Sequence, residues 1–497
     1  MKFLWSTLKS NYLLIAVLLI SLFFRTYKVV ERFEFAHDGD LFSWIVKDIV
    51  IDHHPRLIGQ LTSAPGIFIG PLYYYSLIPF FLLTKMDPVG AIIPITIIGI
   101  LTTFSYWFVF KKLWNEKAGL IAAFLHAILY TWVYFDRRIV PSTPTNLWTI
   151  WYFYCVVNLA RGNFKVLWIV GLLVGLIWHI HIALLPALVA IPAAFFFSKK
   201  LPTKKDFLLF TFYFLLTSIP LILFEFRHNF SQTKSLFFNF SKEHGSSPGG
   251  LEKIQEVLTK ISSNVEKLFF FPQSFPGNKF IFFAIILSIG LFLVYKKCLK
   301  LKEALLFYSW VLTIILFYGL SSSILSEYYF YNIEVILVGF VTLLFIWLFN
   351  QSKWLKYIVI ATLSVIFINN AHYLTTSYYY AKGYNERKEL TEFIVNDSKS
   401  KNYPCVAISY IASPGEDVGF RYFFWLNNLH VNKPSSGSPV YSIVQPEHLA
   451  YGKNEKHFGQ IKLIPPPENE VKSSQEIQKS CAGENSNLTD SMFGFTK

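Results

Sequence analysis

Long apolar runs separated by short polar segments fill about the first three quarters of the chain. A helix needs roughly 20 apolar residues to cross the hydrocarbon core of a bilayer, and it satisfies its own backbone hydrogen bonds there. The pattern therefore predicts a polytopic bundle of about eleven membrane-spanning helices. These are expected at residues 11–24, 88–110, 118–135, 143–160, 166–180, 183–197, 207–224, 280–295, 304–325, 328–349 and 354–374.

Two stretches need separate treatment. Residues 166–197 would form one helix of about 48 Å, longer than a span requires, so we expect a break near His179, His181 and Pro186. Residues 66–83 are apolar but contain prolines and a block of tyrosines typical of a membrane interface. If this segment does not cross, every later basic cluster falls on the side of Lys2 and Lys9. The positive-inside rule favours that interfacial or re-entrant arrangement.

This topology places the N-terminus in the cytoplasm and the C-terminus outside. Residues 1–375 then form a membrane module whose long external loops are 25–87 and 225–279, and residues 376–497 form a small extracytoplasmic α/β domain. In the second loop, apolar residues spaced by three and four from Leu251 to Leu268 predict an amphipathic helix on the outer leaflet. In the tail, residues 406–411 are expected to form a strand. Cys405 and Cys481 both lie outside, where a disulfide is an option.

Composition supports the membrane interpretation. The chain is 53% hydrophobic and only 15% charged, unlike soluble globular domains. Its net charge of +14 comes from short basic clusters between apolar runs and not from one basic face, which argues against a nucleic-acid partner. The apolar run after Lys2 and Lys9 has no small-residue cleavage site, so we expect an uncleaved first span.

The first external loop contains the strongest candidate for chemistry, Asp38-Gly39-Asp40. Two carboxylates flank a glycine close to the membrane surface, although the same sequence is common in solvated turns. The chain continues through an apolar-rich helix to His53 and His54, and then through a Gly-Pro-Leu-Tyr-Tyr-Tyr segment that includes Tyr74. That path would return the chain to the membrane and build a cleft beside the two aspartates.

Other polar residues are expected on the same side. Arg137 and Arg138 follow the third span, where they suit bidentate capture of a phosphate, or binding of lipid headgroups. His181 lies with His179 at the outer end of the fifth span, where an imidazole often bonds a neighbouring helix. Glu327 is an external carboxylate after the ninth span, and an ordinary loop acid is an equal alternative.

Together these motifs resemble the GT-C glycosyltransferases, and most nearly the branch of protein O-mannosyltransferases, aminoarabinose transferases and their bacterial relatives. The resemblance covers residues 11–374 as architecture, with its specific motifs in about the first 190. It implies a sugar donor carried on polyprenyl phosphate and a catalytic acid in the first external loop. The chain has Asp-Gly-Asp where the family commonly has Asp-Glu, so either Asp38 or Asp40 could take the catalytic place.

The implied reaction is an inverting displacement, in which an acceptor attacks the anomeric carbon and polyprenyl phosphate leaves. We assign Asp38 as the base and Asp40 as the residue that orients it. Partners are the lipid-linked donor, membrane lipids and an acceptor that is a protein, a lipid or a glycan. No cofactor is certain, and a divalent cation held by Asp38 with His53 or His54 stays open. The predicted substrate-binding residues are Arg25, Arg137, Arg138, His181, Glu327 and Tyr74.

Two other classes compete with an enzyme. A transporter or flippase of lipid-linked sugars would also be polytopic, but it should have ionisable residues within its spans. The predicted spans contain few, His126 being the clearest. A non-enzymatic assembly subunit is the third class.

Overall fold

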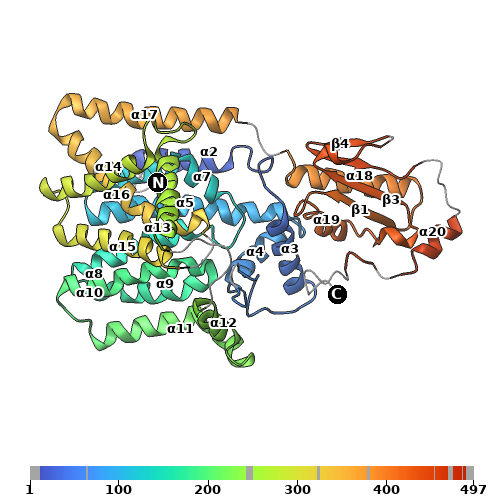
Figure 1. Cartoon of the computed structure of the whole chain (residues 1–497), viewed down its shortest axis with the longest axis horizontal. Helices are drawn as coiled ribbons and strands as arrows, with labels where there is room; N and C mark the ends of the chain where they lie inside the picture. Colours follow the sequence, from blue (N-terminus) through green and yellow to red (C-terminus); the bar gives the residue numbers. More distant parts are fainter. Residues whose placement is uncertain are drawn as a thin grey trace, which may run out of the picture.

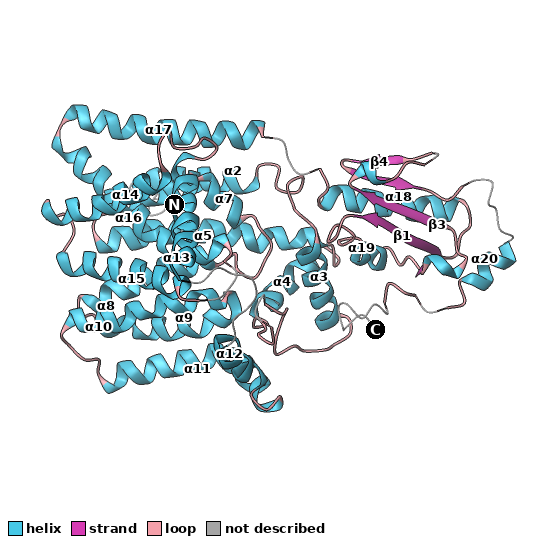
Figure 2. Ribbon diagram, viewed as in Figure 1, coloured by secondary structure: helices cyan, strands magenta, loops and turns pink. Residues whose placement is uncertain are grey.

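The computed structural model describes residues 12–62, 65–241, 250–321, 325–377, 381–452, 454–467, 474–483 and 485–488. A helical bundle lies beside a small C-terminal α/β unit, with α3 (His37–Val50) and α4 (Leu72–Leu83) between them (Figure 1). The named strands all belong to the C-terminal unit (Figure 2). The mainly helical fold with a small C-terminal sheet is therefore confirmed.

The bundle contains five helical segments that are long and apolar enough to cross a membrane among the described residues, or six if one bent pair counts as a span. The five are Pro88–Leu113, Lys204–Arg227, Leu301–Gly319, Glu327–Gln351 and Lys353–Thr376, and five further apolar helices are shorter. The count of eleven spans thus stays a prediction. The bundle helices are α2 (Tyr12–Thr26), η1 (Pro88–Ala91), α5 (Ile92–Leu113), α6 (Glu116–Ile128), α7 (Tyr130–Asp136), α8 (Thr145–Ala160), η2 (Phe164–Val166), α9 (Leu167–Ile180), η3 (Ile182–Val189), α10 (Ala190–Ser198), α11 (Lys204–Arg227), α14 (Lys279–Tyr295), α15 (Leu301–Gly319), η4 (Glu327–Phe330), α16 (Tyr331–Gln351) and α17 (Lys353–Thr376).

Two breaks interrupt helices of the bundle. The chain leaves helical geometry at His181, between α9 and η3, which confirms the break expected there. The predicted span at 118–135 is not continuous, because α6 and α7 meet at a 68° bend. Leu129 has an extended backbone at this bend, and the Tyr130 N–H donates to Asn370 Oδ1 at 3.0 Å. A side chain of α17 thus satisfies one backbone donor that the break releases.

The second long loop forms α12 (Ser231–Ser241) and the predicted amphipathic helix, α13 (Gly250–Phe270). In Figure 1, α13 runs across the direction of the neighbouring bundle helices. Its apolar residues Val257, Ile261, Val265 and Leu268 are buried in the bundle core, and α13 packs against α14 and α15. Protein, and not the outer leaflet, therefore covers this face from Val257 to Leu268, while Leu251 at its start is 84% exposed.

The C-terminal unit is a five-stranded sheet in the order β2-β1-β3-β5-β4. The strand expected at 406–411 is confirmed as β1, which pairs in parallel with β2 and β3, while β5 pairs antiparallel with β3 and β4. Buried residues of α18, such as Leu390 and Ile394, form one core cluster with the sheet. The elements are α18 (Tyr384–Ser400), β1 (Val406–Ala412), α19 (Arg421–Leu426), β2 (Val431–Asn432), η5 (Pro434–Ser436), β3 (Val440–Gln445), η6 (Glu447–Leu449), β4 (Lys456–Phe458), β5 (Ile461–Ile464) and α20 (Ser474–Ser480).

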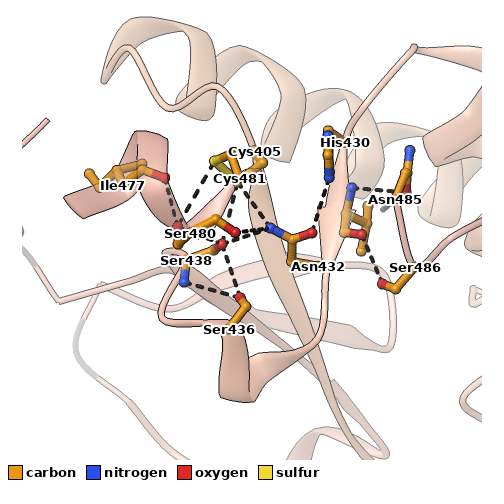
Figure 3. Close-up of a disulfide and its surroundings, with 11 residues drawn as sticks. Cys405, His430, Asn432, Ser436, Ser438, Ile477, Ser480, Cys481, Asn485 and Ser486 are labelled. Atoms are coloured by element: carbon orange, nitrogen blue, oxygen red, sulfur yellow. Dashed lines mark hydrogen bonds between the residues drawn. A yellow bond between two sulfur atoms is a disulfide. The ribbon is translucent and has the colours of Figure 1, made fainter. Parts of the chain in front are cut away.

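A disulfide joins Cys405, just before β1, to Cys481, just after α20 (Figure 3). The two Cα atoms lie 5.7 Å apart. Beside the bond, Asn432 Nδ2 donates to Ser438 Oγ at 3.0 Å and to the Ser480 carbonyl at 2.9 Å. The disulfide and this network fasten α20 to the sheet.

Candidate active site

A cavity of about 520 Å³ opens where the bundle meets the C-terminal unit. Four segments line it: the chain from Arg32 to Asp38, α7 with the residues that follow it, the end of α17, and the turn between β4 and β5. The turn contributes Gln460. Residues more than 400 positions apart in the sequence thus share one cavity.

Three arginines line this cavity, Arg32, Arg137 and Arg138. Arg32 Nη2 donates to the carbonyls of Leu374 at 2.8 Å and Ser377 at 3.1 Å. Arg137 Nη2 donates to the carbonyl of Tyr27 at 2.9 Å. Backbone carbonyls therefore hold two of the three arginines in place, and their combined positive charge suits a phosphate.

Two carboxylates face the same cavity. Asp38 lies in the first turn of α3, partly exposed, where the helix dipole favours a negative charge. Glu34 precedes the helix, and its Oε1 accepts a hydrogen bond from the Tyr134 hydroxyl at 3.0 Å. Gly39 lets Phe35 pack closely, because a Cβ at position 39 would lie 2.7 Å from the Phe35 ring. The cavity thus combines a cationic group of residues with carboxylates.

Asp40 is not among the described residues that line this cavity. It is fully buried, and its Oδ1 accepts the Tyr422 N–H of α19 at 3.0 Å. Burial raises the pKa of the Asp40 carboxyl to about 6, with the Tyr422 N–H and Arg421 opposing that rise. The structure therefore brings Asp38 to the cavity, and directs Asp40 to the C-terminal unit.

Arg25 does not reach the cavity either. Its side chain is buried in the bundle, where Nη2 lies 2.5 Å and Nε 3.0 Å from Asp136 Oδ2. Arg25 was expected to bind the lipid phosphate or the sugar, whereas in the structure its guanidinium group is paired with a buried carboxylate.

The other predicted binding residues also have different partners. The Tyr74 hydroxyl donates to Gln60 Oε1 at 3.0 Å and fixes the loop before α4. His181 Nδ1 accepts the Ala183 N–H at 3.1 Å and caps η3. Glu327 Oε1 lies 3.3 Å from Lys267 Nζ. The described residues lining the cavity include none of these three side chains.

The predicted cation site is not assembled. Asp38 lies in the first turn of α3 and the two histidines follow its end, so roughly 18 Å of helix separates them. His54 Nδ1 instead lies 3.0 Å from Asp48 Oδ1. Within the described part of the chain, no three His, Cys, Asp or Glu side chains form a group that could hold a metal. Asp38, His53 and His54 therefore do not fit a shared cation.

Sequence reasoning missed Arg32, Glu34 and Gln460. The first two alternate with phenylalanines in Arg-Phe-Glu-Phe, directly ahead of the aspartate motif, and that proximity was a usable signal. Gln460 has no local signal, because only the tertiary fold brings it to the cavity.

No known family model and no curated protein sequence matches the chain. Solved structures do. The aminoarabinose transferase ArnT from Cupriavidus metallidurans in the apo state aligns at a TM-score of 0.57 and 11% identity, over 96% of this chain and 99% of that one. ArnT bound to undecaprenyl phosphate aligns at a TM-score of 0.54 and 11% identity, over 92% of this chain and 98% of that one. The oligosaccharyltransferase of Archaeoglobus fulgidus, in complex with zinc and sulfate, aligns at a TM-score of 0.50 and 10% identity, over 88% of this chain and 68% of that one.

The chain shares the overall fold of these membrane glycosyltransferase structures. The resemblance expected from its motifs is therefore confirmed for the architecture, and it extends beyond residue 374 into the C-terminal unit. The apolar helices of the described residues, long enough to cross a bilayer, indicate a membrane protein.

Proposed function

We propose that the protein is a glycosyltransferase that moves a sugar from a polyprenyl-phosphate donor to an acceptor on the extracytoplasmic side. The observation that carries this proposal is the cavity in which Arg32, Arg137 and Arg138 lie with Asp38. A site for this reaction needs cations for the departing phosphate and one carboxylate base. The GT-C fold supports the donor class, since ArnT was solved with undecaprenyl phosphate bound.

In the proposed reaction, an acceptor hydroxyl or amine attacks the anomeric carbon and gives its proton to Asp38. The bond between that carbon and the phosphate oxygen breaks, and its electron pair stays on the phosphate. The three arginines stabilise the developing charge, so no general acid is required. Direct displacement inverts the anomeric configuration. Arg32 takes the role first expected for Arg25.

The extracytoplasmic side is part of the proposal. A disulfide such as Cys405–Cys481 persists in oxidising compartments, and the C-terminal unit that contains it also supplies Gln460 to the cavity. The basic clusters between the predicted spans favour the cytoplasm for the opposite side.

The test begins with mass spectrometry of lipid-linked sugars and surface glycans from a deletion strain, which identifies the donor and the product. Transfer is then measured with the purified full-length protein in liposomes. Asp38→Asn should lower turnover roughly 10²- to 10⁴-fold, because the base is lost. Asp52→Asn is the matched control, since Asp52 lies in the same loop and bonds Lys47 at 2.6 Å. Full turnover by Asp38→Asn would refute the assignment of the base.

A further inference from the structure

Asp136 is the last residue of α7 and directly precedes the two arginines of the cavity. Its carboxylate turns into the bundle and meets Arg25, with Oδ2 2.5 Å from Nη2 and 3.0 Å from Nε. The two side chains are 1% and 0% exposed, respectively. Such a buried ion pair is costly to form and damaging to break, so its location calls for an explanation.

The bundle is built to hold Arg25 in this place. Its Nη1 donates to Ser21 Oγ at 2.9 Å, and its Nη2 lies 3.2 Å from His126 Nδ1. Gly99 of α5 leaves room for the guanidinium, because a Cβ there would lie 2.5 Å from Arg25 Nε. Three helices, α2, α5 and α6, thus fix the cation that receives Asp136.

Two consecutive residues fasten the end of α7 to α2 and to the residues that directly follow α2. Asp136 bonds Arg25 inside the bundle, and Arg137 donates to the carbonyls of Tyr27 at 2.9 Å and Lys28 at 3.3 Å outside it. The helix has only 7 residues, and the bend at Leu129 separates it from α6. A helix this short is not stable on its own, so its orientation depends on contacts with its neighbours, and these two hold its C-terminal end.

We propose that Arg25 and Asp136 form a positioning pair for phosphate binding: the pair fixes the end of α7, so that Arg137 and Arg138 are directed into the cavity. This inference rests on the proposed function. Arg25 then acts on the substrate through Asp136, without touching it.

The test uses the full-length protein in lipid nanodiscs and undecaprenyl phosphate as the probe, with affinity measured by native mass spectrometry. Asp136→Asn removes the charge but keeps the shape of the side chain. It should weaken binding roughly 10- to 100-fold, because a displacement of about 1 Å in a binding group has effects of that size. Arg25→Lys keeps the positive charge and loses the paired donors, so it should weaken binding less. Arg25→Lys also tests the proposal if the Asp136→Asn protein does not fold and cannot be purified.

The matched control is Glu303→Gln. Glu303 is 1% exposed and bonds Arg161 at 2.8 Å, and neither residue lines the cavity. Glu303→Gln breaks a second ion pair with a buried carboxylate, so it should lower the melting temperature and leave the affinity for undecaprenyl phosphate within about twofold of the wild type. Equal losses of affinity in both variants would reveal a general structural role and overturn the positioning role.

Arg138→Gln separates the two proposals. One outcome would overturn the positioning role alone and leave the proposed function standing. In that outcome the wild type binds undecaprenyl phosphate and Arg138→Gln weakens the binding, but Asp136→Asn does not. If the wild type does not bind undecaprenyl phosphate, both are overturned.

Discussion

Asp38 and Asp40 are two positions apart in the first turn of α3, and helical geometry sends them in different directions. Successive helical residues are rotated by about 100°, so these two side chains point about 200° apart around the axis. Asp38 lines the cavity, while Asp40 is buried against α19. One helix turn thus supplies a candidate base on one face and a contact to the C-terminal unit on the other.

The raised pKa of Asp40, about 6 against an ordinary 3.8, gives a prediction with a definite sign. The folded protein holds this proton more tightly than the unfolded chain, so the stabilisation is complete below about pH 3.8 and is lost as the pH rises through 6. Asp40→Asn stays neutral at every pH. It should flatten the fall in melting temperature between pH 4 and 7, and it should retain transfer activity. The prediction would be contradicted if the melting temperature fell equally with pH in the wild type and in Asp40→Asn. It would also be contradicted if Asp40→Asn lost as much transfer activity as Asp38→Asn.

A second prediction concerns Arg32, whose Nε is buried and has no hydrogen-bond partner among the described residues. Arg32→Gln should weaken the affinity for undecaprenyl phosphate roughly 10- to 100-fold, the usual loss for a hydrogen bond to a charged group. The control is Arg56→Gln, because Arg56 bonds Asp48 at 2.6 Å near the far end of α3. Calorimetric titration of both variants checks the prediction, and equal affinities would rule out phosphate binding by Arg32.

At this scale, the sequence predicts residues whose chemistry is visible in a short motif. Asp38, Arg137 and Arg138 belong to such motifs, and all three line the cavity. Arg25 was also expected to bind substrate, because the sequence does not show that Asp136 lies within reach of its side chain. Whether an arginine faces a cavity or an internal carboxylate is decided by packing between segments about 110 residues apart.

Among the helices, hydrophobic periodicity predicts which segments are helical more readily than it predicts what covers them. α13 shows this, because its spacing of apolar residues is the same whether lipid or protein lies against them. The break at Leu129 was equally hidden, since the Asn370 side chain that satisfies Tyr130 comes from another helix.

The packing of α13 leads to a third prediction. Ile261 is fully buried in the bundle core, so Ile261→Ala should lower the free energy of unfolding by about 2–5 kcal/mol. Leu251 lies on the same helix but is 84% exposed, and Leu251→Ala should change the free energy by less than about 0.5 kcal/mol. Denaturant titration in detergent compares the two. Similar values would mean that α13 is not packed as described.

For the whole molecule, sidedness is the property on which the proposed chemistry depends. Tyr451 in the C-terminal unit and Tyr295 at the end of α14 are 77% and 75% exposed. In a Cys298→Ser background, a membrane-impermeant maleimide should label Tyr451→Cys on intact cells, and Tyr295→Cys only after permeabilisation. The reverse pattern would place the cavity in the cytoplasm and contradict the use of an extracytoplasmic acceptor.

Gln460 lies in the turn between β4 and β5, yet it lines the cavity with residues of the bundle. Chimaeras that join this bundle to the C-terminal unit of a relative would therefore rebuild part of the substrate chamber. Such hybrids would be expected to differ in which sugar or acceptor they admit, even where they fold equally well, so domain exchange offers a route to altering selectivity without touching a membrane helix.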